Sequence, residues 1–230
     1  MGGAARLRRS ASGPSRSREA IGDTERAMDL DAALVEELRR AHGVHTVILY
    51  GSRARGDATA DSDVDVVGFA EVAATERDAR LWNGLFLDAF VYPTALAEAP
   101  DADMVKLCGG RVLLDERQLA GPLLEKVAAL DRQPPPVLPE GHQRMLRVWA
   151  RKMLVRVRRD DVEAHYRRHW LLQQLLEDYF ALRGLRYRGP KEALAGLRVD
   201  APAVFAAFER ALAPGATDEA LEALVDCVVG

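Results

Sequence analysis

The sequence predicts an α+β protein, in which an N-terminal half of strands and helices is followed by an all-helical half. Three observations lead to this prediction. Short β-rich runs occur only before residue 115, helical periodicity continues from there to the C-terminus, and a proline-rich stretch at 133–140 separates the two parts. We therefore expect one domain at 28–132, a linker at 133–140 and a second domain at 141–230.

The strands and helices of the first domain follow from local patterns. Leucines at helical spacing predict a helix over 29–42, which Gly43 ends. Runs of β-branched and aromatic residues predict strands at 44–50, 64–70, 85–92 and 111–114. Beyond residue 140 only helical patterns occur, and the expected helices span 141–158, 161–183, 191–197, 201–212 and 218–228.

The composition is that of an ordinary folded chain. Of 230 residues, 48% are hydrophobic and 29% are charged, with a formal net charge of −3. These values disfavour a disordered or fibrous chain and a protein that coats nucleic acid. Two cysteines are too few for a disulfide framework or a structural zinc site, and no apolar run reaches the roughly 20 residues that cross a bilayer. We expect a cytoplasmic protein with neither membrane nor nucleic acid as a partner.

The first 27 residues differ from the rest of the chain. Six arginines lie there among Gly, Ala and Ser, with almost no large apolar side chain. Such a segment buries too little surface to offset its ordering entropy, so we expect 1–27 to be a disordered basic tail. A basic arm that binds nucleic acid is the alternative. Because Met28 directly precedes the first periodic helix, either Met1 or Met28 is the start of the natural protein.

Three carboxylates on two of the expected strands carry the most chemical information. Asp63 and Asp65 begin one strand and point to the same side, about 7 Å apart. Asp88 is the only charged residue of 85–92, and it faces the same point if its strand pairs beside the other. Repelling carboxylates at the rim of a buried strand suit Mg²⁺, which takes one or two of them together with water and substrate phosphate. Three could hold two Mg²⁺ ions, the arrangement that clamps the attacking and leaving oxygens of phosphoryl transfer.

A glycine–serine turn precedes these carboxylates. A strand that ends at Gly51 and opens a helix presents free backbone N–H groups to an anion. Gly51 allows a phosphate to approach the backbone closely, and the Ser52 hydroxyl can donate to a phosphate oxygen. Arg53 and Arg55 add positive charge for a triphosphate, although arginines on a loop are often simply solvated.

This pattern resembles the nucleotidyltransferase signature of the DNA polymerase β superfamily. The resemblance consists of Gly51-Ser52, ten further residues, Asp63-Val64-Asp65 and a later strand that carries Asp88. Arg55-Gly56 and Ser62-Asp63 are similar to the small bacterial members, which include the antibiotic nucleotidyltransferases.

The resemblance implies a small mixed sheet flanked by helices, and transfer of a nucleotidyl group from a nucleoside triphosphate, expected to be ATP, with Mg²⁺. It also implies that Ser52 binds the β- and γ-phosphates and that Asp63 and Asp65 bind metal. By the same resemblance, Asp88 ligates the metal on the acceptor side and helps to deprotonate the attacking hydroxyl.

The helical half is similar in type to the acceptor domain of the kanamycin and lincosamide nucleotidyltransferases. In that group an acidic residue outside the metal triad can be the general base, and Glu163 is the candidate here. His165 and His169 share a helix face, but no third metal ligand accompanies them. This segment either lines an acceptor pocket or forms a core stripe of Tyr166, Trp170, Leu171, Leu175 and Tyr179.

The leading hypothesis is therefore an Mg²⁺-dependent nucleotidyltransferase that transfers a nucleoside monophosphate, expected to be AMP, to a hydroxyl of a small molecule such as an antibiotic. Alternatives with the same chemistry are a protein acceptor, as in toxin–antitoxin pairs, and an RNA end. A non-catalytic nucleotide-binding or interaction module is the alternative from another class. Analogy with the kanamycin enzyme also suggests a homodimer that shares its active site.

Overall fold

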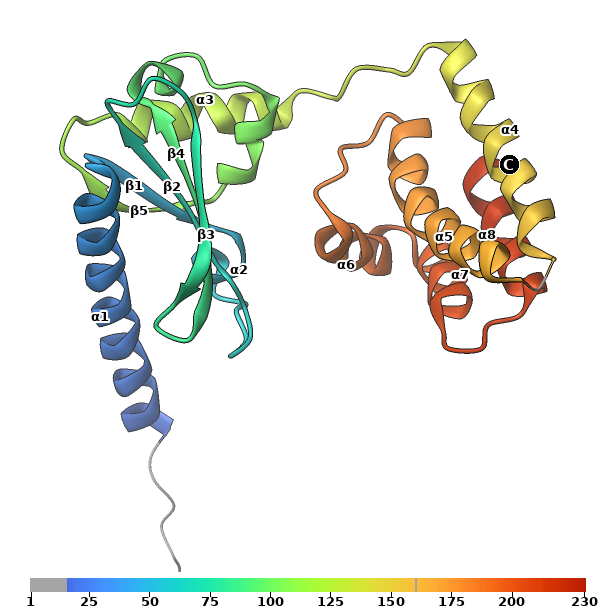
Figure 1. Ribbon diagram of the computed structural model, residues 1–230, viewed down its shortest axis with the longest axis horizontal. Helices are drawn as coiled ribbons and strands as arrows, with labels where there is room; N and C mark the ends of the chain where they lie inside the picture. Colours follow the sequence, from blue (N-terminus) through green and yellow to red (C-terminus); the bar gives the residue numbers. More distant parts are fainter. Residues whose placement is uncertain (1–15, 160) are drawn as a thin grey trace, which may run out of the picture. The chain divides into compact units, whose positions relative to one another are not determined.

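The computed structural model describes residues 16–159 and 161–230, which form two compact units (Figure 1). The first unit ends at Asp131, and the second runs from Arg132 to Gly230. The first contains a mixed sheet with helices and the second is helical, so the predicted α+β fold class is confirmed. No helix in the described part of the chain is both long and apolar enough to cross a membrane.

A five-stranded mixed sheet forms the centre of the first unit, with strand order β3-β4-β2-β1-β5. Its strands are β1 (Thr46–Tyr50), β2 (Val64–Ala70), β3 (Glu76–Trp82), β4 (Leu85–Pro93) and β5 (Arg111–Asp115). β2 and β4 are parallel neighbours, whereas the other neighbouring pairs are antiparallel. The expected pairing of the strand that carries Asp88 beside the strand that carries Asp65 is thus confirmed.

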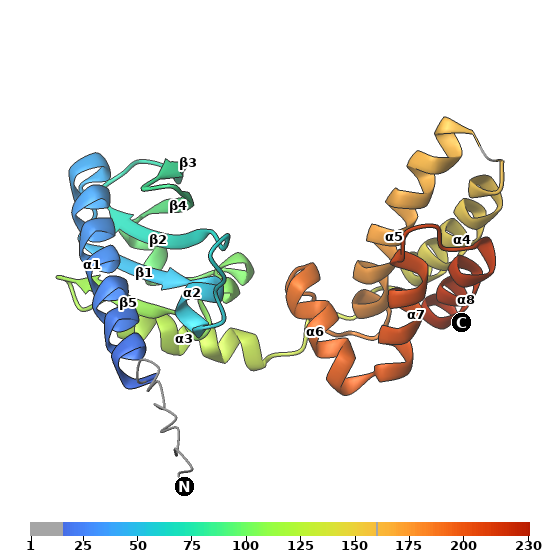
Figure 2. The same ribbon diagram turned by 90° about the horizontal axis from the view of Figure 1, so that it is seen from below.

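Helices cover both faces of this sheet (Figure 2). They are α1 (Arg16–His42), α2 (Gly51–Arg55), the 3₁₀ helices η1 (Thr94–Ala97) and η2 (Ala102–Leu107), and α3 (Ala120–Arg132). Leu34 and Leu38 of α1 pack on one face, against inward side chains of β1 and β2. α3 and η2 pack on the other face, where Leu123 meets Ile48 and Phe69 in a second core.

Helix α1 begins earlier than the sequence pattern predicts. Its backbone includes residues 16–27 of the expected tail, because the segment that leads into 29–42 contains several strong helix formers such as Glu, Arg and Ala. Residues 1–15, the rest of the expected tail, lie outside the described residues.

The edge strand β3 is not among the strands that the sequence predicts. It forms a hairpin with β4 through Asn83-Gly84, whose φ angles are 50° and 78°. Asn-Gly between two strands is a strong hairpin signal, so the turn was readable. The strand itself was not, because the sequence Glu-Arg-Asp-Ala-Arg-Leu-Trp of a mostly exposed edge lacks an apolar run.

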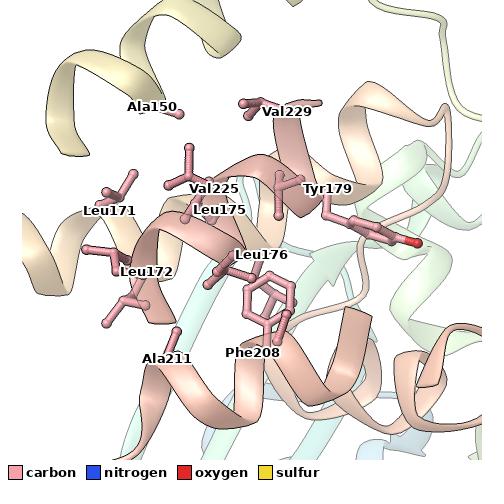
Figure 3. Close-up of a cluster of buried hydrophobic side chains, with 14 of the residues drawn as sticks. Ala150, Leu171, Leu172, Leu175, Leu176, Tyr179, Phe208, Ala211, Val225 and Val229 are labelled. Carbon is pink, nitrogen blue, oxygen red and sulfur yellow. The ribbon is translucent and has the colours of Figure 1, made fainter. Parts of the chain in front are cut away.

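The second unit contains all five expected helices: α4 (Glu140–Val157), α5 (Val162–Leu182), α6 (Pro190–Asp200), α7 (Pro202–Leu212) and α8 (Asp218–Val229). Its core gathers apolar side chains from all of these helices, many of them labelled in Figure 3. Leu171, Leu175 and Tyr179 belong to this core, as the stripe interpretation predicts. Tyr166 and Trp170 do not, since they are 69% and 44% exposed. Trp170 directly precedes the core residue Leu171, and Tyr166 lies one helical turn before Trp170. Both side chains are therefore rotated away from the core around the helix axis.

Candidate active site

One row of the sheet brings two of the predicted metal ligands together. Asp88 of β4 is the register partner of Asp65 in β2, and Asp65 is the register partner of Tyr50 in β1. Register partners point to the same face, so the three side chains form a row across β4, β2 and β1. Phe90 and Tyr92 follow Asp88 on this face, which is the face that α3 and η2 cover.

The turn after β1 lies against this row. Gly51 has a φ of 71°, and a Cβ atom on it would lie 2.3 Å from Oδ2 of Asp65. A Cβ atom there would force the Asp65 side chain to move, so the backbone conformation and the carboxylate beside it both favour glycine. Ser52 is buried at the start of α2, next to this contact. Its predicted contact with phosphate remains a prediction.

Arg53 holds the loop that leads to Asp63. Its Nε donates to the carbonyl of Asp63 at 3.0 Å, and its Nη2 donates to the carbonyl of Ser62 at 2.7 Å. The guanidinium therefore anchors the loop to α2, and its expected contact with a triphosphate stays a prediction. Arg55 forms an ion pair with Asp57 at 3.4 Å. Asp63 itself is exposed, just before the first residue of β2.

The negative charges of Asp63 and Asp88 repel that of Asp65. Burial raises the pKa of Asp65, and the negative charges of Asp63 and Asp88 raise it further. The positive charges of Arg55 and Lys106 partly oppose that rise. Such a cluster is stabilised by an added cation, which relieves the repulsion and replaces lost hydration.

Asp88 is already paired with a positively charged side chain. Arg77 of β3 donates from Nε to Oδ1 at 2.8 Å and from Nη2 to Oδ2 at 2.9 Å, so both carboxylate oxygens are engaged. Among the described residues, no group of three or more His, Cys, Asp or Glu side chains is arranged to hold a metal ion. The backbone brings Asp88 beside Asp65, but its side chain is directed to Arg77 instead of closing a three-carboxylate cluster.

Lys106 is a site residue that the sequence interpretation missed. Its ammonium lies 3.8 Å from the centre of the Phe90 ring and donates to the Tyr92 hydroxyl at 3.3 Å. Burial lowers the pKa of Lys106, and the nearby charge of Asp88 opposes that shift. The signal in the sequence is a single cation within the apolar run of η2, at 104–107.

Glu163 lies in the second unit, exposed on α5. Nε of Arg167 donates to its Oε1 at 2.9 Å, and this contact lowers the pKa of Glu163. A general base works best with a pKa near the operating pH, so the surroundings of Glu163 shift it in the unfavourable direction.

A different acid in α5 has a raised pKa. Asp178 is 2% exposed, and burial raises its pKa. Gln174 donates to its Oδ1 at 3.0 Å, while Oδ2 is buried without a hydrogen-bond partner among the described residues. The sequence interpretation did not select Asp178, although this acid lies beside the apolar residues Leu171, Leu175 and Tyr179, which repeat at helical spacing.

Comparison with known protein families finds a match within the first unit. Residues 32–97 match the family model of the nucleotidyltransferase domain, and this span contains the Gly51-Ser52 turn and all three carboxylates. The chain carries a nucleotidyltransferase domain. The motif resemblance to the polymerase β superfamily is confirmed at this level, and the matched residues make up less than half of the chain.

A crystal structure of a nucleotidyltransferase-like protein from Exiguobacterium sibiricum is also similar to the chain. The two are 15% identical with a TM-score of 0.38, over 87% of this chain and 74% of that one. No curated protein matches the chain at a significant level. The nucleotidyltransferase domain implies a nucleoside triphosphate substrate, and the comparisons leave the acceptor open.

Proposed function

We propose that the chain is an Mg²⁺-dependent nucleotidyltransferase that transfers a nucleoside monophosphate, AMP by expectation, to a hydroxyl of a small-molecule acceptor. The observation that carries this proposal is the in-register pairing of Asp65 and Asp88 on parallel strands, beside the Gly51-Ser52 turn of a nucleotidyltransferase domain. A helical unit in the same chain and a net charge of −3 favour a small acceptor over a nucleic acid.

The donor set fits a hard divalent cation. All three acids offer oxygen ligands, and the pKa of Asp65 is raised by burial and by the charges of Asp63 and Asp88, a cost that a bound cation removes. Asp63 and Asp65 would hold Mg²⁺, with Asp88 as a third ligand on the acceptor side. When bound, Mg²⁺ neutralises phosphate charge and makes the attacking hydroxyl more acidic.

The residues of the chain itself would bind and orient the reactants. The Ser52 hydroxyl donates to a phosphate oxygen, and Gly51 leaves the backbone open beside it. The acceptor oxygen forms a bond to the α-phosphorus while the bond from that phosphorus to the bridging oxygen of pyrophosphate breaks. Asp88 accepts the proton that the acceptor hydroxyl loses. Glu163 is the alternative base, and its ion pair with Arg167 argues against it.

Transfer of label from [α-³²P]ATP tests this function. The full chain is incubated with Mg²⁺ and separately with aminoglycosides and lincosamides, cell protein, or tRNA. We expect label on a small molecule, lost in Asp65→Asn and kept in Asp61→Asn, an exposed acid of the loop that precedes β2. Label on protein or RNA alone would contradict the small acceptor. Absence of both turnover and nucleotide binding would favour a non-catalytic module.

A further inference from the structure

The ion pair between Arg77 and Asp88 has no part in the chemistry proposed above. Arg77 lies on the edge strand β3, opposite Phe90 in the register of β3 and β4. Asp88 lies two residues before Phe90, so the arginine shares the face of the carboxylate row and reaches Asp88 diagonally. The strand positions themselves bring this guanidinium to the proposed metal site.

Phe90 holds Arg77 in place. The guanidinium carbon lies 5.1 Å from the centre of the Phe90 ring, and the ammonium of Lys106 lies 3.8 Å from the same centre. Cations bind aromatic faces electrostatically, so this ring anchors two positive charges next to Asp88. The bidentate contact with Asp88 adds a fixed geometry to the position of Arg77.

The contact places Arg77 in competition with a metal. Both oxygens of Asp88 accept hydrogen bonds from the guanidinium, and the carboxylate is only 17% exposed. A partly buried carboxylate needs one counter-cation, and a metal ligated by Asp88 would supply it in place of Arg77. An arginine does not release its own proton, so it leaves the carboxylate only by moving away.

We propose that Arg77 is a positioning residue, an internal cation that a divalent metal must displace from Asp88, and that it thereby sets the metal affinity of the site. This inference rests on the proposed function, because the competing metal is the one assigned to the carboxylates. A guanidinium freed from Asp88 matches the geometry of a phosphate group. A triphosphate that attracts Arg77 therefore raises the affinity for metal, and metal raises the affinity for triphosphate by the same factor.

Binding of Mn²⁺ to the full chain without nucleotide tests the proposal, with free Mn²⁺ measured by electron paramagnetic resonance. We expect Arg77→Gln to bind Mn²⁺ about tenfold more tightly than the wild type, and Arg77→Lys to show a smaller gain. When Asp88→Asn is added to both proteins, the wild type and Arg77→Gln should no longer differ. Arg80→Gln is the matched control, because Arg80 lies on the same strand but pairs with Asp78 and Glu37 on the other face. It should leave Mn²⁺ binding unchanged.

The outcomes separate this inference from the proposed function. If Mn²⁺ binding depends on Asp65 but is no tighter in Arg77→Gln than in the wild type, the role of Arg77 is overturned and the metal site stands. Absence of Mn²⁺ binding in the wild type and in Arg77→Gln overturns both. A second measurement uses the wild type, in case a variant fails to fold. The NMR signal of the Arg77 Nε–H is identified as the one that Arg77→Lys removes. This signal should shift when Mg²⁺ is added, and an unmoved signal contradicts displacement.

Discussion

The backbone of Gly51, directly after β1, lies against the side chain of Asp65 in β2. A Cβ atom at residue 51 would lie 2.3 Å from Oδ2 of Asp65, and the φ of 71° at this residue also favours glycine. The turn and the carboxylate therefore depend on each other. The Gly51-Ser52 motif positions an acid in addition to any phosphate that it binds.

This relationship predicts the effect of Gly51→Ala. The left-handed backbone costs roughly 1–2 kcal/mol for alanine, and the collision with Asp65 adds to that cost and displaces the carboxylate. We expect a loss of stability in urea unfolding and at least a tenfold loss of turnover.

Gly56→Ala, with φ 82° and open space around it, should show only the backbone cost. Gly121→Ala in α3, which has open space and no strained backbone, should stabilise by about 0.5–1 kcal/mol. Equal effects at residues 51 and 56 would contradict the collision.

Asp88→Asn should reduce turnover at least a hundredfold with the fold retained, because the amide cannot take a proton and ligates a hard cation poorly. Steady-state rates and circular dichroism at equal protein concentration measure the two effects separately. Turnover at the wild-type rate would refute both the proton transfer and the ligand role.

The raised pKa of Asp65 predicts how the stability of the metal-free protein depends on pH. A carboxyl with a folded pKa above its unfolded value binds more protons in the folded state within that window. Stability therefore falls as pH rises from the usual aspartate pKa through the raised one. Asp65→Asn removes this loss, so at pH 7 without metal its Tm should exceed that of the wild type. A lower Tm for the variant at pH 7 would contradict the repulsion among the three acids.

Glu163→Gln should change the turnover less than fivefold, since an exposed carboxylate with a lowered pKa is a weak base at neutral pH. The rate at saturating acceptor concentration is the decisive measurement. A hundredfold loss there, with an unchanged KM for ATP, would assign the general base to Glu163 instead.

Part of the site was readable from sequence because its signals are local. The two apolar strands, the glycine before a helix and the isolated acid in 85–92 each stand out within a few residues. The pairing of β2 with β4 then places Asp65 beside Asp88.

The missed features depend on contacts distant in sequence. β3 lies at the sheet edge with one side exposed, so its pattern is weak, and Arg77 meets Asp88 only through the hairpin register. Lys106 reaches Phe90 from a 3₁₀ helix. The charge of Arg53 is visible in the sequence and suggests a phosphate contact, whereas its contacts with backbone carbonyls are not visible there.

The most direct measurement is anomalous density for Mn²⁺ in crystals grown with a non-hydrolysable ATP analogue. We predict Mn²⁺ bound by Asp63 and Asp65, with Asp88 turned from Arg77 toward the metal and the phosphates beside Ser52. Mn²⁺ located elsewhere, with Asp88 still paired to Arg77 and no phosphate at the turn after β1, would contradict the account.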